Sequence, residues 1–387
     1  MALSGASPAS CRLPQVLSPL PLHPPTRAAF FLVIPTYAIR FYRIYDIGEE
    51  TDLSSLENAL ARSMVIARAS FVRVRPASMT IAEPPLLIRL PPVSVQHGTD
   101  TFTCFVSVRI FDFGAISICL ILEERDAPAA LLEPAALRFP GQAGLDHHFA
   151  AALAQVHEIL TPYIGDRNID QRFYDDYTIY LADHLDDAVD PVAVLLGEKL
   201  DFSAGLRNDT LKHQLSYEIS DRAILSWSGA ILVGPEHPAD LIELIEFAAV
   251  QVFELRFYDR ELSSHMAKMF DDIEVADKLF WYRKLRQYHA LMKVLMRTQT
   301  EVSEVIEKVN NLIKITDDVY YARVYAMALQ VLRSTQWTES VNRRMEVIRE
   351  NYRMLSDEVD VQHSNFLEWV IIILIAIEVA IFLPGVL

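Results

Sequence analysis

Apolar and polar positions divide this chain into two parts with different patterns. Up to Pro238, short runs rich in β-branched and aromatic residues alternate with turn residues, which is typical of strands. Two windows, 53–68 and 147–164, have helix-like spacing instead. After Pro238, the 145 residues from 239 to 383 contain neither glycine nor proline. The pattern predicts an α+β domain on a mainly antiparallel sheet with helices, followed by an almost entirely helical region.

Within the helical region, apolar residues recur at alternating steps of three and four. Such spacing predicts helices that pack at a shallow angle, as an antiparallel hairpin within one chain or as a coiled coil between chains. The hairpin is the simpler alternative, with the reversal around residues 334–340; the coiled coil would make the protein a homo-oligomer. The first run is Leu285, Tyr288, Met292, Leu295, Gln299, Val302, Ile306, Val309 and Ile313, and the second is Val341, Met345, Ile348, Tyr352, Leu355, Val359, Gln362 and Phe366.

The C-terminal segment FLEWVIIILIAIEVAIFL, residues 366–383, is apolar apart from Glu368 and Glu378. Eighteen helical residues rise about 27 Å, close to the ~30 Å hydrocarbon core of a bilayer. A carboxylate inside the core costs about 3 kcal/mol, which the many Val, Ile, Leu and Phe side chains offset. We therefore expect a transmembrane helix with membrane lipid as its partner, rather than a buried helix of a soluble protein.

These patterns together predict four segments. Residues 1–28 form a disordered leader or, alternatively, a transit peptide; 29–262 form the α+β domain; 263–365 form the helical hairpin or coiled coil; and 366–383 form a tail anchor. The protein would then be a single-pass membrane protein whose body stays on the side of synthesis. That side is the cytoplasm, or the mitochondrial matrix if the protein is organellar.

Composition excludes several function classes. A formal net charge of −16 disfavours a general nucleic-acid binder. The three cysteines, Cys11, Cys104 and Cys119, lack the spacing of a disulfide framework or a zinc site. No nucleotide-binding loop, zincin motif or hydrolase nucleophile motif occurs. We therefore expect no enzymatic activity and no cofactor.

One acidic and histidine-rich region leaves a metal-dependent enzyme as a minor alternative. Asp146, His147 and His148 are consecutive, and Asp183 and His184 follow later with further aspartates. Adjacent histidines on a helix point about 100° apart, so both rarely bind one ion. A capped helix start with solvated side chains is the expected role.

A basic segment interrupts the acidic chain between residues 278 and 297. Its aromatic neighbours suggest binding of anionic lipid or of RNA. The alternative is that its charges pair with acidic residues of a packed helix, and we favour this structural role. The basic residues are Lys278, Arg283, Lys284, Arg286, Lys293 and Arg297.

Several segments resemble the "required for meiotic nuclear division" family, a domain of unknown function. Leu367, Glu368, Trp369 and Glu378 lie in the apolar stretch LEWVIIILIAIEV, which is similar to the C-terminal signature of that family. The Phe113-Gly114 turn within IFDFGAISICLILE, and the segments LSYEISDRAIL and QVFELRFYDREL, follow the same order. The resemblance implies a divergent, membrane-anchored, non-enzymatic scaffold or assembly protein. The alternative function is a membrane tether that binds RNA or ribosomes through residues 278–297.

Overall fold

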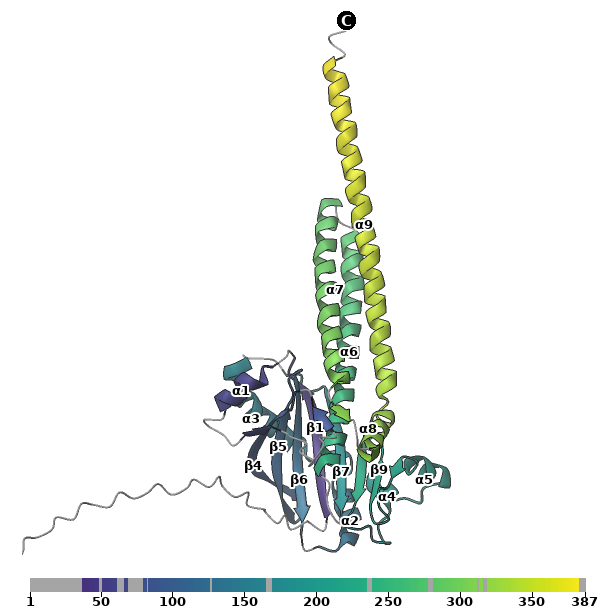
Figure 1. Ribbon diagram of the computed structural model, residues 1–387. Helices are drawn as coiled ribbons and strands as arrows, with labels where there is room; N and C mark the ends of the chain where they lie inside the picture. The colour runs from purple at the N-terminus through teal and green to yellow at the C-terminus, as the bar shows by residue number, and fades with distance from the viewer. Residues whose placement is uncertain are drawn as a thin grey trace, which may run out of the picture. The chain divides into compact units, whose positions relative to one another are not determined.

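The computed structural model describes most of the chain, and all described elements belong to one unit, Ile34–Leu387 (Figure 1). The predicted leader 1–28 lies outside the described residues. The described ranges are 37–48, 51–60, 66–68, 79–81, 83–125, 127–164, 169–234, 239–277, 281–311, 313–315 and 319–382.

Among the described residues, nine strands form one mixed sheet in the order β2-β4-β5-β6-β1-β7-β10-β9-β8. Neighbouring strands are antiparallel except β7 and β10, which run parallel. Two short strands, β3 and β11, pair separately. The strands are β1 (Tyr37–Asp46), β2 (Ile66–Arg68), β3 (Met79–Ile81), β4 (Leu86–His97), β5 (Asp100–Ile110), β6 (Ala115–Glu124), β7 (Tyr174–Ala182), β8 (Gln214–Leu215), β9 (Arg222–Leu225), β10 (Gly229–Val233) and β11 (Ile313–Ile315).

Helices cover both faces of this sheet, because its central strands are apolar on both sides. Along β1, Phe41 and Tyr45 point into one core cluster and Tyr42 and Ile44 into the other, as the two-residue period of a strand requires. The first face packs against α1 (Leu53–Leu60), α2 (Leu132–Arg138), α3 (Asp146–Ile164) and α4 (Pro191–Leu196), and the second against α6 (Ala239–Asp277) and α8 (Val319–Val331); α5 (Ala204–Thr210) contributes no buried residue.

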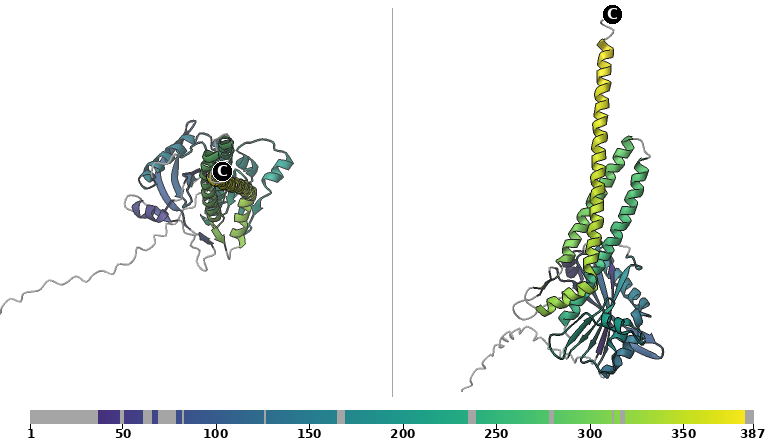
Figure 2. Two further views of the ribbon diagram at one scale, coloured as in Figure 1. Left: turned by 90° about the horizontal axis from the view of Figure 1, so that it is seen from above. Right: turned by 90° about the vertical axis from the view of Figure 1, so that its right-hand side faces the viewer.

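Three long helices lie side by side beyond the sheet: the second half of α6, α7 (Trp281–Asn310) and α9 (Ser334–Phe382), which we call the stalk (Figures 1 and 2). Heptad residues of both predicted runs meet there within one chain, and α6 joins them as a third helix. The predicted boundary at residue 262 therefore falls inside α6. The buried stalk residues are Leu262, Met269, Tyr288, Val302, Val341, Met345 and Ile348.

The predicted transmembrane helix is wrong. None of the helices that the structure describes combines the length and the apolar character needed to cross a bilayer. The segment is the end of the 49-residue helix α9, and Glu368 and Glu378 enclose only nine uninterrupted apolar residues, 369–377. Nine helical residues rise about 14 Å, half of the ~30 Å hydrocarbon core. The tail anchor, the single-pass topology and the membrane localisation all depended on this helix and are not supported.

One of the β-branched runs before Pro238, which the pattern predicts as strands, is a helix. VAVLLG, residues 192–197, belongs mostly to α4, whose start is capped by the Asp190 side chain accepting from the Val192 N–H at 3.0 Å. Pro191 occupies the first turn, and Gly197 ends the helix at φ 70°. These capping residues outweigh the β-branched composition of the run.

Candidate functional sites on the stalk

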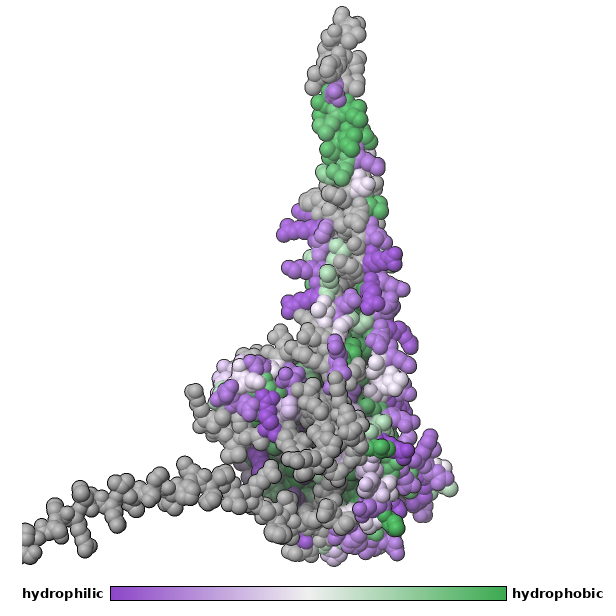
Figure 3. All heavy atoms as spheres, in the orientation of Figure 1, coloured by the Kyte–Doolittle hydropathy of each residue, from purple (hydrophilic) through white to green (hydrophobic). Residues whose placement is uncertain are grey.

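The end of α9 exposes a continuous apolar surface beyond α6 and α7 (Figures 1 and 3). We call Leu367–Ile377 the apolar end of α9. The side chains of Ile371, Ile372, Ile373, Leu374 and Ile375 are each 53–60% exposed. A surface helix normally keeps a polar face, and this stretch has none apart from Glu368. Contiguous exposed apolar surface of this kind is typical of a binding site.

The four residues of the predicted anchor signature all lie on this exposed helix end. Leu367, Glu368, Trp369 and Glu378 are exposed, and Trp369 is 64% exposed. Glu368 and Glu378 are ten residues apart, which places them about 80° apart around the helix. The two carboxylates therefore lie near opposite ends of the apolar stretch, on neighbouring sides of it.

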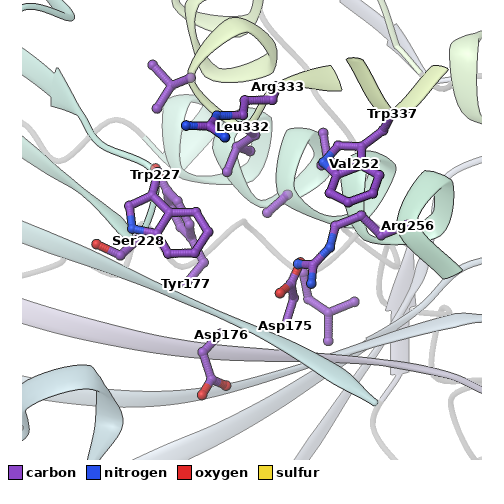
Figure 4. A pocket seen from close by; sticks show the side chains of 13 residues that line it. Asp175, Asp176, Tyr177, Trp227, Ser228, Val252, Arg256, Leu332, Arg333 and Trp337 are labelled. Atoms are coloured by element: carbon purple, nitrogen blue, oxygen red, sulfur yellow. The ribbon is translucent and has the colours of Figure 1, made fainter. Parts of the chain in front are cut away.

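A second candidate site lies where α8 turns into α9, above the sheet. Here a cavity of about 200 Å³ opens between β7, the β9–β10 turn, α6 and the α8–α9 turn (Figure 4). We call it the junction pocket. Its lining residues are Ile44, Asp175, Asp176, Tyr177, Trp227, Ser228, Ala249, Val252, Arg256, Val331, Leu332, Arg333 and Trp337.

The β9–β10 turn positions Trp227 at the mouth of the junction pocket. Ser226 N–H donates to the Gly229 carbonyl at 2.7 Å, which closes a tight turn with Trp227 and Ser228 at its tip. A Cβ at Gly229 would lie 2.6 Å from the Thr178 carbonyl oxygen, so only glycine lets β10 approach β7 this closely. Trp227 itself is 73% exposed.

Charged groups on the sheet side of the pocket are paired. Arg256 forms an ion pair with Asp175, and its guanidinium lies 5.6 Å from the ring centre of Trp337. Burial raises the pKa of Asp175, against the opposing effect of Arg256. Asp176 accepts two hydrogen bonds from Arg43, at 2.6 and 2.8 Å, and burial raises the pKa of its carboxyl as well.

Arg333 lies on the opposite side, in the turn between α8 and α9. Its φ is 62°, in the left-handed region that favours glycine. Its backbone N–H donates to Gln330 at 3.1 Å, and its carbonyl accepts from Trp337 at 3.3 Å. The exposed guanidinium lines the pocket, and Figure 4 shows it on the same side as the Trp227 ring.

The Phe113-Gly114 turn lies outside both sites and has a structural role. It joins β5 to β6, where the Phe111 N–H donates to the Ala115 carbonyl at 2.9 Å and Gly114 has φ 100°. Phe113 is buried in the core against α6. A hairpin of this kind needs a residue at positive φ, which explains the glycine.

The basic residues of α7 that the structure describes share one face. Arg283, Arg286, Lys293 and Arg297 are exposed, and at 100° per residue they fall within an arc of about 80°. The buried Tyr288 points in roughly the opposite direction, into the stalk. Lys278 and the side chain of Lys284 lie outside the described residues.

The acidic and histidine-rich region does not assemble a metal site among the described residues, where no three His, Cys, Asp or Glu side chains converge. Asp146 instead accepts a hydrogen bond from Arg43 at 2.9 Å. The ring centres of His147 and His148 lie 3.7 Å apart. Burial and the nearby His147 both lower the pKa of His148. Asp183 lies 2.7 Å from the His184 ring nitrogen.

Comparison with known proteins identifies the α/β body. A family model described as "Uncharacterized protein MJ0711, N-terminal domain" matches residues 36–240, more than half of the chain. The chain belongs to the MJ0711 N-terminal domain family. "Uncharacterized protein MJ0711" of Methanocaldococcus jannaschii is 26% identical over 233 residues, covering 56% of this chain and 68% of the relative. No solved structure matches the chain.

The predicted membership of the "required for meiotic nuclear division" family is wrong, because the chain belongs to the MJ0711 N-terminal domain family instead. The segments that suggested it have general structural causes. The Phe113-Gly114 turn is a hairpin that requires positive φ. LSYEISDRAIL runs from the last residue of β8 through a bend into β9. The apolar end of α9 lies outside the residues that the MJ0711 model matches.

Sequence reasoning missed the junction pocket. Trp227, Arg256, Arg333 and Trp337 come from three distant segments, and no motif spacing connects them. One local signal was present: Trp227 sits in the turn between two strand-like runs, where a large aromatic residue is unusual. A further signal, an arginine at the end of a helix in the left-handed conformation, is visible only in the structure.

Proposed function

We propose that this protein is a non-enzymatic assembly protein, and that copies of it associate through the apolar end of α9. The observation that carries the proposal is the exposure of Leu367–Ile377 at the tip of the stalk. Removing this apolar surface from water stabilises an association by about 25 cal/mol per Å². The helix is apolar on every side, so one partner helix would bury only part of it.

A second copy of the chain is the occupant that fits this surface. Apolar side chains from equivalent helices can surround one another in a bundle, with α9 of each copy continuing from its own stalk. The heptad residues Val341, Met345 and Ile348 are already buried within one chain. Association between copies would therefore use the helix end and leave the stalk core intact.

The test is the oligomeric state of the full chain in solution. We expect light scattering to report an oligomer of defined size for the full chain, and a monomer for a chain truncated after Asn365. The double variant Ile372→Gln and Ile375→Gln should also be monomeric. Val361→Gln is the matched control, because Val361 is an exposed apolar residue of α9 upstream of the apolar end. If the truncated chain and the double variant keep the oligomer, the proposal is wrong.

A second candidate function is RNA binding by α7, which the arrangement of its basic side chains favours. Arg283, Arg286, Lys293 and Arg297 are exposed on one face, pointing away from the stalk core, in a chain of net charge −16. Such a stripe can contact successive phosphates.

This candidate predicts salt-sensitive binding of single-stranded RNA. Arg286→Glu with Lys293→Glu should abolish it, whereas Arg353→Glu, at an exposed position on α9, should leave it unchanged. Equal binding by both variants would refute an RNA-binding role for this face.

A further inference from the structure

The junction pocket has the features of a ligand site, and nothing in the assembly role uses it. Its cavity of about 200 Å³ has an aromatic side chain on either side, Trp227 from the β9–β10 turn and Trp337 from α9 (Figure 4). Trp227 is 73% exposed although its neighbours Leu225 and Ala230 are fully buried. A tryptophan held at the tip of a tight turn offers a rigid face on which a planar ring can stack.

Arg333 differs from the other arginines at the pocket in its side-chain partners. Arg256 pairs with Asp175, and Arg43 pairs with both Asp176 and Asp146. In the part of the chain that the structure describes, no hydrogen bond or ion pair of the Arg333 guanidinium is found, although its backbone is bonded on both sides. The pocket therefore presents a guanidinium group at its upper edge, next to an aromatic face.

The backbone at Arg333 supports a role for its side chain. A helix that ends in the left-handed conformation usually has glycine or asparagine there, because a Cβ atom destabilises this backbone conformation. Arg333 occupies this position with φ 62°. Strained residues that persist are concentrated at functional sites, so the outlier points toward use of the guanidinium.

We propose that the junction pocket binds a small organic anion with a planar ring, whose ring stacks on Trp227 and whose anionic group pairs with Arg333. The volume equals that of about seven water molecules at ~30 Å³ each, which is enough for one ring with one carboxylate. The guanidinium fork binds a carboxylate through two parallel hydrogen bonds. Neutral rings and ringless anions each satisfy only half of this site.

Calorimetric titration of the full chain with three probes tests the proposal. Benzoate has the ring and the charge, benzamide has the ring alone, and acetate has the charge alone. We expect saturable binding of benzoate, with at least tenfold weaker binding of benzamide and acetate. No saturable binding of benzoate, or equal binding of benzamide, would overturn the proposal.

Substitutions then locate the bound benzoate. Trp227→Ala and Arg333→Ala should each weaken benzoate binding at least tenfold, and Arg343→Ala, an exposed arginine ten residues further along the chain, should change it less than twofold. Arg333→Gly is the safeguard against misfolding, because glycine suits φ 62° and should raise the unfolding temperature while still removing binding. Unchanged benzoate affinity in folded Arg333→Gly would place the ligand elsewhere and refute the site.

Discussion

Replacing Ile348 by alanine tests whether the stalk is held together within one chain. Ile348 is fully buried in the cluster that joins α6, α7 and α9. The substitution removes three buried carbon atoms, worth about 0.8 kcal/mol each, so the transfer contribution is about 2.4 kcal/mol. The cavity left behind adds to this, and the total loss of unfolding free energy should lie between about 2 and 5 kcal/mol.

Urea denaturation followed by circular dichroism measures this loss. Val361→Ala is the matched control on the same helix, because Val361 is 56% exposed and its truncation should change stability by no more than about 0.5 kcal/mol. In a chain truncated after Asn365, which lacks the apolar end of α9, the midpoints of both variants should be independent of protein concentration, since packing within one chain involves no association step.

Two results would contradict the packing of the stalk within one chain. The first is a loss for Ile348→Ala no larger than that for Val361→Ala. The second is a loss that disappears as the protein concentration rises, because a contact between chains is strengthened by mass action. That second result would favour the coiled coil between chains.

Three further predictions concern single positions. Gly229→Ala should destabilise the fold by about 1–3 kcal/mol in thermal unfolding, because its Cβ would lie 2.6 Å from the Thr178 carbonyl oxygen; a neutral effect would mean that β10 moves aside freely. Burial and the nearby Asp46 raise the pKa of Glu254 well above the ordinary 4.5, so its folded form keeps a proton that the unfolded chain releases, and stability falls as pH rises above 4.5. Glu254→Met should therefore stabilise the fold most at high pH and progressively less as pH falls toward 4.5. A difference in urea midpoint between the variant and the wild type that stays constant across this pH range would refute the prediction. Glu378→Gln should strengthen self-association in sedimentation experiments, since it removes a like charge from the proposed bundle; weaker association would show that the carboxylate makes a favourable contact.

The sequence predicted features that depend on neighbouring residues better than those that depend on distant ones. The absence of glycine and proline after Pro238 corresponds to long helices, and α6 begins at Ala239. The spacing of Tyr288 and Ile348 marked positions that are buried in the stalk. Local spacing carries this information because a helix repeats every 3.6 residues.

Features that depend on tertiary contacts were predicted poorly. The spacing of α7 and α9 did not reveal that α6 would join them, because its stalk residues Leu262 and Met269 continue a helix that first packs on the sheet. The junction pocket was invisible for the same reason. Composition alone predicted a membrane span at the apolar end of α9, because it gave more weight to the apolar side chains than to the two carboxylates that interrupt them.

The continuity of α6 determines the smallest part of this chain that can fold by itself. Residues 241–255 of this helix cover one face of the sheet, against side chains such as Tyr42, Ile179 and Leu232. The family match ends at residue 240, just as the helix begins. A fragment that ends there would expose this apolar face to water and should aggregate. In a fragment that retains the first half of α6, the helix still buries this face. In this chain the segment that the family model matches is therefore smaller than the unit of cooperative folding.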